Sequence, residues 1–497
     1  MAVIVFLTLG LAGAAGGAPA ADSTDGDDRA RLAAGCDELL RAAVKTPYGW
    51  GWKSSEVVVR PVDPRATPPR AAVPRRGSPP PQAATIDLRA TAGAGLVLHL
   101  AGRQLGEARY THAALQAARA IAAVQMNTGQ VPATGVVRAN AGGRDEPAAV
   151  PSRAATCAGL GLLLTLVHDH RGDDAEADGE QGTLAREGGP IHRAAVKAAK
   201  WLAGQQTRSG GWLVGYPPDA APGDATRLVR LDTPDYRDAT IALWLAADVL
   251  GDDRLARKAE QAVEDLVVLR IADERGAGNN LWSSAYGGDG ALMRKFPELA
   301  PAIDTLASRN AMQALLAACL LGDAEATAPV LKEAAAALAK LPRVNGAWRR
   351  IYDLNVSLSA PAPPPPGGDA PAPAADEPPT SPLFPSASPG PGESELAIGV
   401  AEMVRAASRL EAVGHEGLLK ELDAGLPFRH RLALVACGLA DEAIAAEAAT
   451  PGGGAANAGD LPARLRELAL LAWRMRSSIS PAQSNGDETA REKTTGG

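Results

Sequence analysis

Two kinds of side chain in this sequence could take part in chemistry on an anionic ligand. Arg349 and Arg350 are adjacent, and a guanidinium group can grip a carboxylate through two parallel hydrogen bonds. A surface ion pair is the simpler interpretation of both. Asp87, Asp232 and Asp238 each stand at or just before the expected start of a helix. An aspartate there commonly caps the helix, and we expect capping to be their main role.

A histidine-containing segment is a second candidate site. His168, Asp169 and His170 follow one another at the end of an expected helix. Asp173 and Asp174 lie a few positions further on. Imidazole and carboxylate groups can bind metals, but alternate residues on a helix do not face one another as residues four apart do. We therefore interpret the segment as a solvated helix terminus.

Turns rich in Gly and Trp recur along the chain, although Trp is scarce elsewhere. Recurrence at a nearly fixed period is the mark of a repeat architecture, in which one unit cannot bury its apolar face alone. We expect the turn tryptophans to fill gaps between repeats, although turn aromatics could also line a sugar groove. The turns cover residues 48–52, 128–132, 210–212, 280–282 and 345–348.

Helix-like stretches come in pairs between these turns, which predicts four helical hairpins. Only 4% of residues are aromatic, and alanine and leucine supply the apolar content, which favours helix over sheet. We therefore predict an all-α fold, an α/α toroid or incomplete barrel of helical hairpins, with an open solenoid as the alternative. The paired stretches are 85–105 with 110–125, 154–168 with 192–206, 236–250 with 254–269, and 303–321 with 325–341.

The N-terminus is typical of an exported protein. An apolar run covers residues 3–11, and small residues follow up to Ala21. This pattern predicts a signal peptide over residues 1–21 and a secreted or periplasmic mature chain. The run is too short to span a bilayer, so we expect no membrane span in the mature chain.

Composition divides the rest of the chain. The toroid domain is expected over residues 28–355, with a Pro-rich insertion over 61–82. A Pro/Ala/Gly-rich linker over 359–392 leads to C-terminal helices over 393–476, which would complete or cap the toroid. The polar tail over 477–497 is expected to be disordered. The C-terminal helical stretches are 393–413, 432–449 and 461–475.

Charge and cysteine usage exclude some functions. The net charge is −7 without a long basic tract, which excludes nucleic-acid binding. We expect a monomer. The cysteines are far apart and lack zinc-ligand spacing, so we expect buried thiols, with one disulfide as the alternative in an exported protein. They are Cys36, Cys157, Cys319 and Cys437.

Four segments resemble, in order, the pectic acid lyases of polysaccharide lyase family 10. Residues 85–91, Thr-Ile-Asp-Leu-Arg-Ala-Thr, are similar to that family's Thr-Ile-Asp-Asn-Gly-Ala-Thr. Residues 210–217 contain a Gly-Gly-Trp and a Tyr-Pro, similar to its Gly-Gly-Trp-Pro-Gln-x-Tyr-Pro. Residues 231–240 fall at its second acidic segment, and residues 348–354 resemble its Trp-x-Arg-Phe-Tyr-Asp-Leu. The resemblance implies a ring of helical hairpins.

The resemblance also implies β-elimination on polygalacturonate. In that family calcium bridges enzyme and substrate carboxylates, so an anionic polymer can approach the acidic site. An Arg then removes the C5 proton. Asp87 matches the first calcium-side aspartate, and Asp238 matches the second loosely. The substrate contacts expected from the resemblance are Trp212, Tyr216, Arg349 and Arg350.

The chain departs from the family at the catalytic base. The stretch that matches the family's Pro-Ala-Arg-x-Tyr-Glu-Leu is residues 300–306, and it contains no Arg. Arg309, shortly after it, is the candidate substitute. Leu88 and Arg89 also replace the family's Asn-Gly beside the first aspartate. The resemblance therefore supports the ring architecture more than it supports cleavage.

These observations yield three functional hypotheses. The first is an exported pectate-lyase-like protein that binds an acidic polysaccharide with calcium as cofactor, and cleaves it slowly or not at all. The second is a noncatalytic helical scaffold, favoured by the Pro-rich insertions and the shortage of candidate site residues. The third is an isoprenoid-cyclase-like toroid, suggested by Asp232-Thr233-Pro234-Asp235.

Overall fold

The computed structural model describes residues 22–46, 48–53, 84–137, 152–170, 183–213, 228–271, 280–288, 290–292, 302–322, 324–344, 347–354, 395–423, 426–439 and 461–477. The predicted signal peptide, Pro-rich insertion and linker lie outside these residues, as do Tyr216 and the tail beyond Ser477. None of the described helices combines the length and the apolar composition that a membrane crossing needs.

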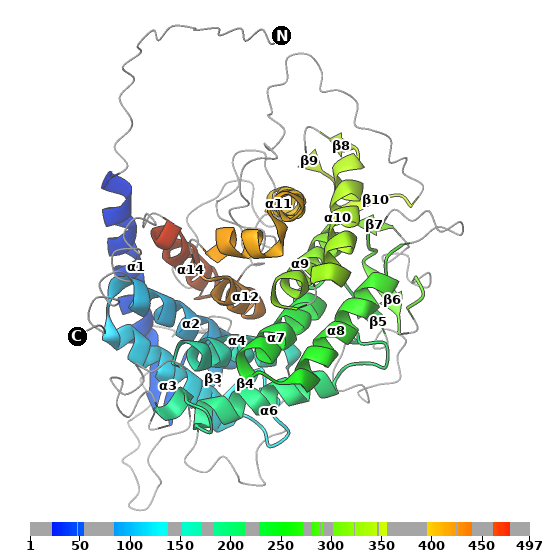
Figure 1. The fold of residues 1–497 in the computed structure, drawn as a ribbon. Helices are drawn as coiled ribbons and strands as arrows, with labels where there is room; N and C mark the ends of the chain where they lie inside the picture. The colour runs from blue at the N-terminus through cyan, green and yellow to red at the C-terminus, as the bar shows by residue number, and fades with distance from the viewer. Residues whose placement is uncertain are drawn as a thin grey trace, which may run out of the picture.

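The core of the molecule is an arc of helical hairpins, as predicted (Figure 1). Its inner helices are almost wholly buried, and each contacts the next one along the arc. They are α2 (Leu88–Leu105), α4 (Arg153–Asp169), α7 (Pro234–Leu250) and α9 (Thr305–Leu321). The outer helices are α3 (Ala108–Val124), α6 (Pro190–Gly204), α8 (Asp253–Val268) and α10 (Ala324–Lys340).

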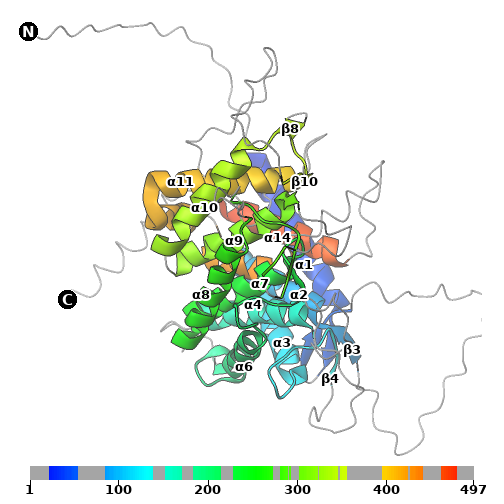
Figure 2. The ribbon, with the colours of Figure 1, turned by 90° about the vertical axis from the view of Figure 1, so that its right-hand side faces the viewer.

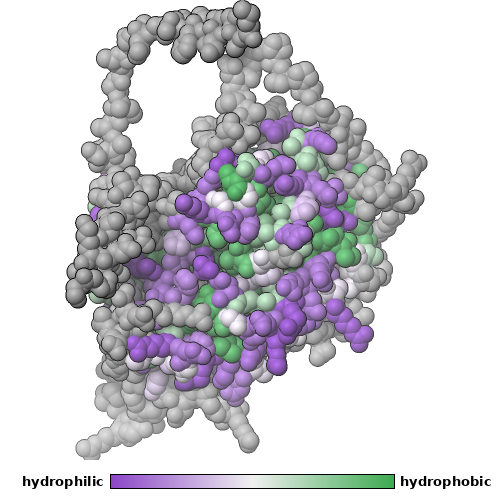
Figure 3. Space-filling model, viewed as in Figure 1, coloured by the Kyte–Doolittle hydropathy of each residue, from purple (hydrophilic) through white to green (hydrophobic). Residues whose placement is uncertain are grey.

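The outer helices bury only one face, because solvent lies on the other. Helix α8 shows the pattern clearly, with buried Leu255, Ala259 and Leu266 on one side and exposed charged residues on the other. Hydrophilic residues accordingly gather over α6 and α8 in the space-filling view (Figure 3). This amphipathic pattern is the periodicity that made the hairpins predictable.

Three further helices occupy the concave side of the arc (Figures 1 and 2). Helix α11 (Glu395–Asp423) contacts α9 and α10, and α12 (Phe428–Ala436) contacts α4 and α7. Helix α14 (Leu461–Ser477) contacts α2 and the N-terminal helix α1 (Asp22–Ala42). The interior of the arc is therefore filled by protein from the C-terminal part of the chain.

The predicted helix over residues 432–449 is wrong in its start and in its continuity past residue 436, and residues 440–449 lie outside the described residues. Helix α12 begins at Phe428 and ends at Ala436. Gly438 follows with a φ of 71°, a left-handed conformation that ends helices and suits glycine. The disulfide alternative is also wrong, because all four cysteines are free and buried.

Short strand pairs lie just before three of the inner helices. The sequence predicted helix from residues 85 and 303, but the chain is extended there and pairs with a later segment. The pairs are β3 (Ala84–Asp87) with β4 (Thr134–Val137), β5 (Leu228–Arg230) with β6 (Ala285–Gly287), and β7 (Ile303–Asp304) with β10 (Ile351–Tyr352). We call these strands and the first turns of the inner helices the N-terminal rim.

The recurring tryptophans anchor each turn to the helix that precedes it. Four are buried, and each donates its indole N–H to a backbone carbonyl near the end of the preceding helix of the repeat. Their packing role is therefore as predicted. The pairs are Trp52 with Leu39, Trp212 with Leu202, Trp282 with Leu266, and Trp348 with Leu338.

Glutamines at the ends of outer helices tie neighbouring hairpins together. The amide of Gln125 donates to the carbonyls of Gly129 and Ala194, at 2.8 and 2.9 Å. Gln206 makes the equivalent pair of bonds one repeat later, to its own turn and to the next outer helix. These bonds therefore link each of the two turns to the outer helix of the next repeat.

Candidate functional site

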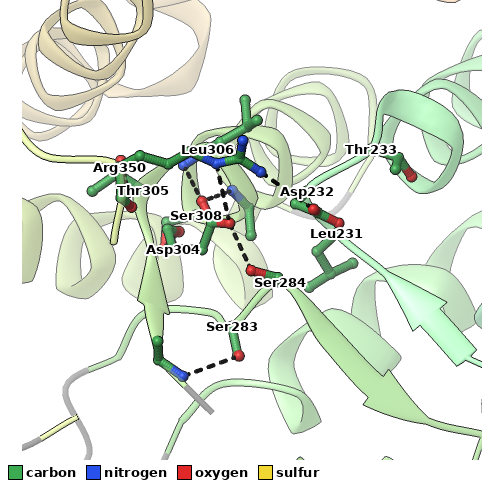
Figure 4. A network of polar contacts seen from close by, with 12 residues as sticks. Leu231, Asp232, Thr233, Ser283, Ser284, Asp304, Thr305, Leu306, Ser308 and Arg350 are labelled. Atoms are coloured by element: carbon green, nitrogen blue, oxygen red, sulfur yellow. Dashed lines mark hydrogen bonds and ion pairs between the residues drawn. The ribbon is translucent and has the colours of Figure 1, made fainter. Parts of the chain in front are cut away.

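The N-terminal rim carries a cluster of charged side chains at the starts of α7 and α9 (Figure 4). Asp304 caps α9 by accepting the backbone N–H groups of Leu306 and Ala307, at 2.8 and 3.2 Å. The hydroxyl of Ser284 donates to its second oxygen at 2.7 Å. Asp304 is fully buried, and burial raises its pKa, although these donors and Arg350 act in the opposite direction.

Two arginines complete what we call the rim cluster: Arg230, Asp232, Ser284, Asp304 and Arg350. Arg230 grips Asp232 with two nitrogens, of which Nε lies 2.8 Å from Oδ1. The hydrogen bond that Arg230 donates to Asp232 raises the pKa of Arg230. Arg350 reaches Asp232 through Nη2 at 3.3 Å and Asp304 through Nε at 3.7 Å. Side-chain exposure is 5% for Asp232 and 52% for Arg350, so buried carboxylates hold a guanidinium that faces solvent.

Backbone contacts fix Arg349 and Arg350 beside the start of α9. The amide of Thr305 donates to the carbonyl of Arg350 at 2.9 Å. Its hydroxyl lies 3.0 Å from the carbonyl of Arg349. Both arginine side chains are exposed, and the predicted surface ion pair is present at Arg350. The sequence missed its partner Asp304, whose only local signal is an aspartate directly before a helix.

A second polar network lies beneath the rim. Arg237 donates from Nη2 to Asp238 at 2.6 Å and from Nη1 to Gln313 at 3.1 Å. Arg309 donates to Asn310 at 3.0 Å. All of these side chains are buried. The capping interpretation of Asp238 is wrong, because α7 begins four residues earlier, at Pro234.

The candidate base Arg309 is enclosed by a C-terminal helix. Gly399 of α11 lies so close that a Cβ on it would be 3.0 Å from Cδ of Arg309. Arg309 is only 5% exposed. With α11 in this position, Arg309 is a partner in the buried network and is not presented to a polymer.

The two predicted calcium ligands are engaged differently. Asp87 is the N-cap of α2, and its Oδ1 accepts the N–H of Ala90 at 2.9 Å, so its capping role is confirmed. Asp238 is buried against Arg237 in α7. Among the described residues, no three His, Cys, Asp or Glu side chains are grouped to hold a metal ion. Calcium binding by Asp87 and Asp238 stays a prediction.

Trp212 is placed for packing. It is 1% exposed, and its ring meets that of Tyr236 edge to face, with centroids 5.3 Å apart. Of the substrate residues expected from the sequence, Arg349 and Arg350 are the ones that the described structure presents to solvent.

Comparisons with known proteins find distant likenesses only among solved structures. No protein-family model and no curated protein matches the chain. A β-1,3-1,4-glucanase from Paenibacillus sp. X4 is 11% identical with a TM-score of 0.42, over 91% of this chain and 93% of its own. A sugar epimerase from a ruminal bacterium is 11% identical with a TM-score of 0.37, and 55% of this chain spans 65% of it.

A variant of a family 10 polysaccharide lyase from Cellvibrio cellulosa, in complex with trigalacturonic acid, is also similar to the chain. It is 13% identical with a TM-score of 0.32, over 54% of this chain and 85% of its own. All three neighbours act on carbohydrates by name. All three TM-scores are below 0.5, so the structural similarity is weak. The function proposed for this chain is therefore argued from the residues of the rim cluster.

Proposed function

We propose that the rim cluster binds an acidic polysaccharide and that the chain acts as a binding protein. The observation that carries this proposal is the half-exposed guanidinium of Arg350, oriented by the buried carboxylates of Asp232 and Asp304. A guanidinium held in this way offers its free N–H groups to a planar carboxylate with little loss of side-chain entropy. The adjacent exposed Arg349 supplies a second cation.

The surroundings of the cluster favour an anionic ligand. Asp232 and Asp304 offset the charges of Arg230 and Arg350, and Arg349 adds a further positive charge. The starts of α7 and α9 lie beside them, and the N-terminal end of a helix carries a partial positive charge. The sequence resemblance to pectic acid lyases supplies the ligand class, a polymer of uronic acids.

The positions of the acidic residues and of Arg309 favour binding over cleavage. A calcium-assisted elimination needs carboxylates free to hold the ion and a base near the sugar. Asp232, Asp238 and Asp304 are buried in ion pairs, and Arg309 is covered by α11. We therefore propose that polymer binding does not require calcium.

The direct test is affinity electrophoresis and calorimetry with polygalacturonate. We expect slowed migration and measurable binding heat, weakened at high salt because exposed charges carry the contact. The fully methyl-esterified polymer, which has no carboxylates, is the matched control and should not bind. Equal affinity for the two polymers would overturn the proposal. Absorbance of unsaturated uronides should not rise, and a calcium-dependent rise would instead establish lyase activity.

A noncatalytic scaffold is the second candidate, favoured by one observation. Helices α11, α12 and α14 fill the concave side of the arc, which leaves less room there for a polymer. If neither polygalacturonate nor its methyl ester binds, the scaffold function replaces polysaccharide binding as the proposal.

A further inference from the structure

A buried carboxylate joins three distant segments at the end of the inner helices opposite the rim. Asp169 is the last residue of α4, and its Oδ2 is hydrogen-bonded to Nε2 of His99 on α2 at 2.7 Å. Nε2 of His430 from α12 lies 3.1 and 3.2 Å from its two oxygens. Nη1 of Arg103 on α2 is 2.5 Å away. The side chain of Asp169 is 7% exposed, so interpreting this segment as a solvated helix terminus is wrong.

The hydrogen bonds determine where the histidine protons are. An ionised carboxylate can only accept, so both imidazoles donate from Nε2. A neutral imidazole that donates from Nε2 carries no proton on Nδ1. The Nδ1 atoms of His99 and His430 are buried and have no hydrogen-bond partner among the described residues. Protonating either ring would leave a buried Nδ1–H donor without an acceptor among the described residues, and a buried unsatisfied donor is costly.

The groups around this cluster add to that cost. Arg103 already neutralises Asp169, so each further proton leaves a net positive charge. His170 and His430 both have ring centroids 6.4 Å from that of His99. On the remaining sides lie His168 of α4 and the ion pair of Arg429 on α12 with Asp248 on α7. The nearby contact with α14 is uncharged, from the amide of Gln104 to the carbonyl of Ala472.

We propose that His99, Asp169 and His430 form an acid-sensitive latch that holds α12 against the inner helices. The latch is closed while both imidazoles are neutral. Protonation breaks it and releases α12 from α4 and α7. Helix α12 would be the first part of the C-terminal layer to loosen, because one of the two histidines belongs to it.

The direction of the pH dependence follows from the pKa shifts. Burial lowers the pKa of His99, and this outweighs the opposite effect of Asp169. Burial also lowers the pKa of His168. For a base with a lowered folded-state pKa, stability is fully present above the unfolded value, about 6.5, and is lost as the pH falls below it. Burial opposes ionisation of Asp169, but the hydrogen bonds from His430 and His99 hold its pKa well below its usual range, so it stays charged throughout this window.

Hydrogen–deuterium exchange of the full chain tests the latch without any substitution. We expect the amides of Phe428–Ala436 to exchange on the order of tenfold faster at about pH 5 than at about pH 7.5, after correction for intrinsic rates, because protection reports the free energy of local opening. The amides of α8, in the outer layer, should change much less. Equal protection of α12 at the two pH values would contradict the proposal.

The double variant His99→Gln/His430→Gln separates the latch from general acid loosening. Glutamine keeps an N–H donor for Asp169 but does not titrate, so the pH response of α12 should disappear. His415→Gln, at an exposed position of α11, is the matched control and should respond as the wild type does. A double variant that still opens in acid would refute the latch. If it does not fold, His99→Gln alone decides, because the pH dependence of the latch follows from the lowered pKa of His99.

Discussion

At the scale of single residues, the charged side chains in and beneath the rim cluster are largely paired with one another. Arg237 is the clearest case, because its side chain is fully buried and bound to Asp238, Asn310 and Gln313. Sequence reasoning predicted the cap at Asp87 and the ion pair of Arg350, because both have local signals. It could not predict that Asp232 and Asp304 are the partners of Arg350, because these contacts join separate segments across the rim.

We predict that Arg237→Leu lowers the free energy of unfolding by about 3–5 kcal/mol, because it leaves Asp238 charged and buried without this partner. Urea denaturation measures the effect. The double variant Arg237→Leu/Asp238→Leu should recover much of the loss, since replacing both members of a buried pair is often nearly neutral. If Arg237→Leu were as stable as the wild type, the burial of the Asp238 carboxylate would not depend on its ion pair with Arg237.

At the scale of elements, the turns between hairpins set the geometry of the arc. The sequence predicted all four hairpins to within a few residues, because their apolar periodicity is local. It missed the short strands before α2 and α9, since two to four extended residues carry no periodicity of their own. It also misplaced α12 and overlooked the burial of Asp169, whose partner His430 is 261 residues away.

Gly210 tests the role of the turns. Its φ is 111°, and a Cβ there would lie 2.1 Å from the carbonyl oxygen of Gln261 on α8. We predict that Gly210→Ala lowers the melting temperature, at a cost of about 2 kcal/mol or more from backbone strain and overpacking. Gly204→Ala, at the end of α6 with open space around it, should be neutral or slightly stabilising. Equal melting temperatures for the two variants would contradict this account.

At the scale of the whole molecule, the two ends of the inner helices have different roles. The N-terminal rim presents Arg349 and Arg350 to solvent, and the opposite end binds α12 through Asp169. The arc was predictable from the sequence. The filling of its concave side by α11, α12 and α14 was not, because no local pattern specifies contacts between helices joined by long Pro- and Gly-rich segments.

The central claim is that the rim cluster binds an acidic polysaccharide, and one comparison of affinities tests it most directly. Arg350→Ala should weaken polygalacturonate binding about tenfold or more, the loss expected for a charge-assisted hydrogen bond. Arg109→Ala removes an arginine of similar exposure, 53% against 52%, which is also paired with an aspartate but lies on α3. It should bind as the wild type does. Equal affinities for the two variants would contradict the account.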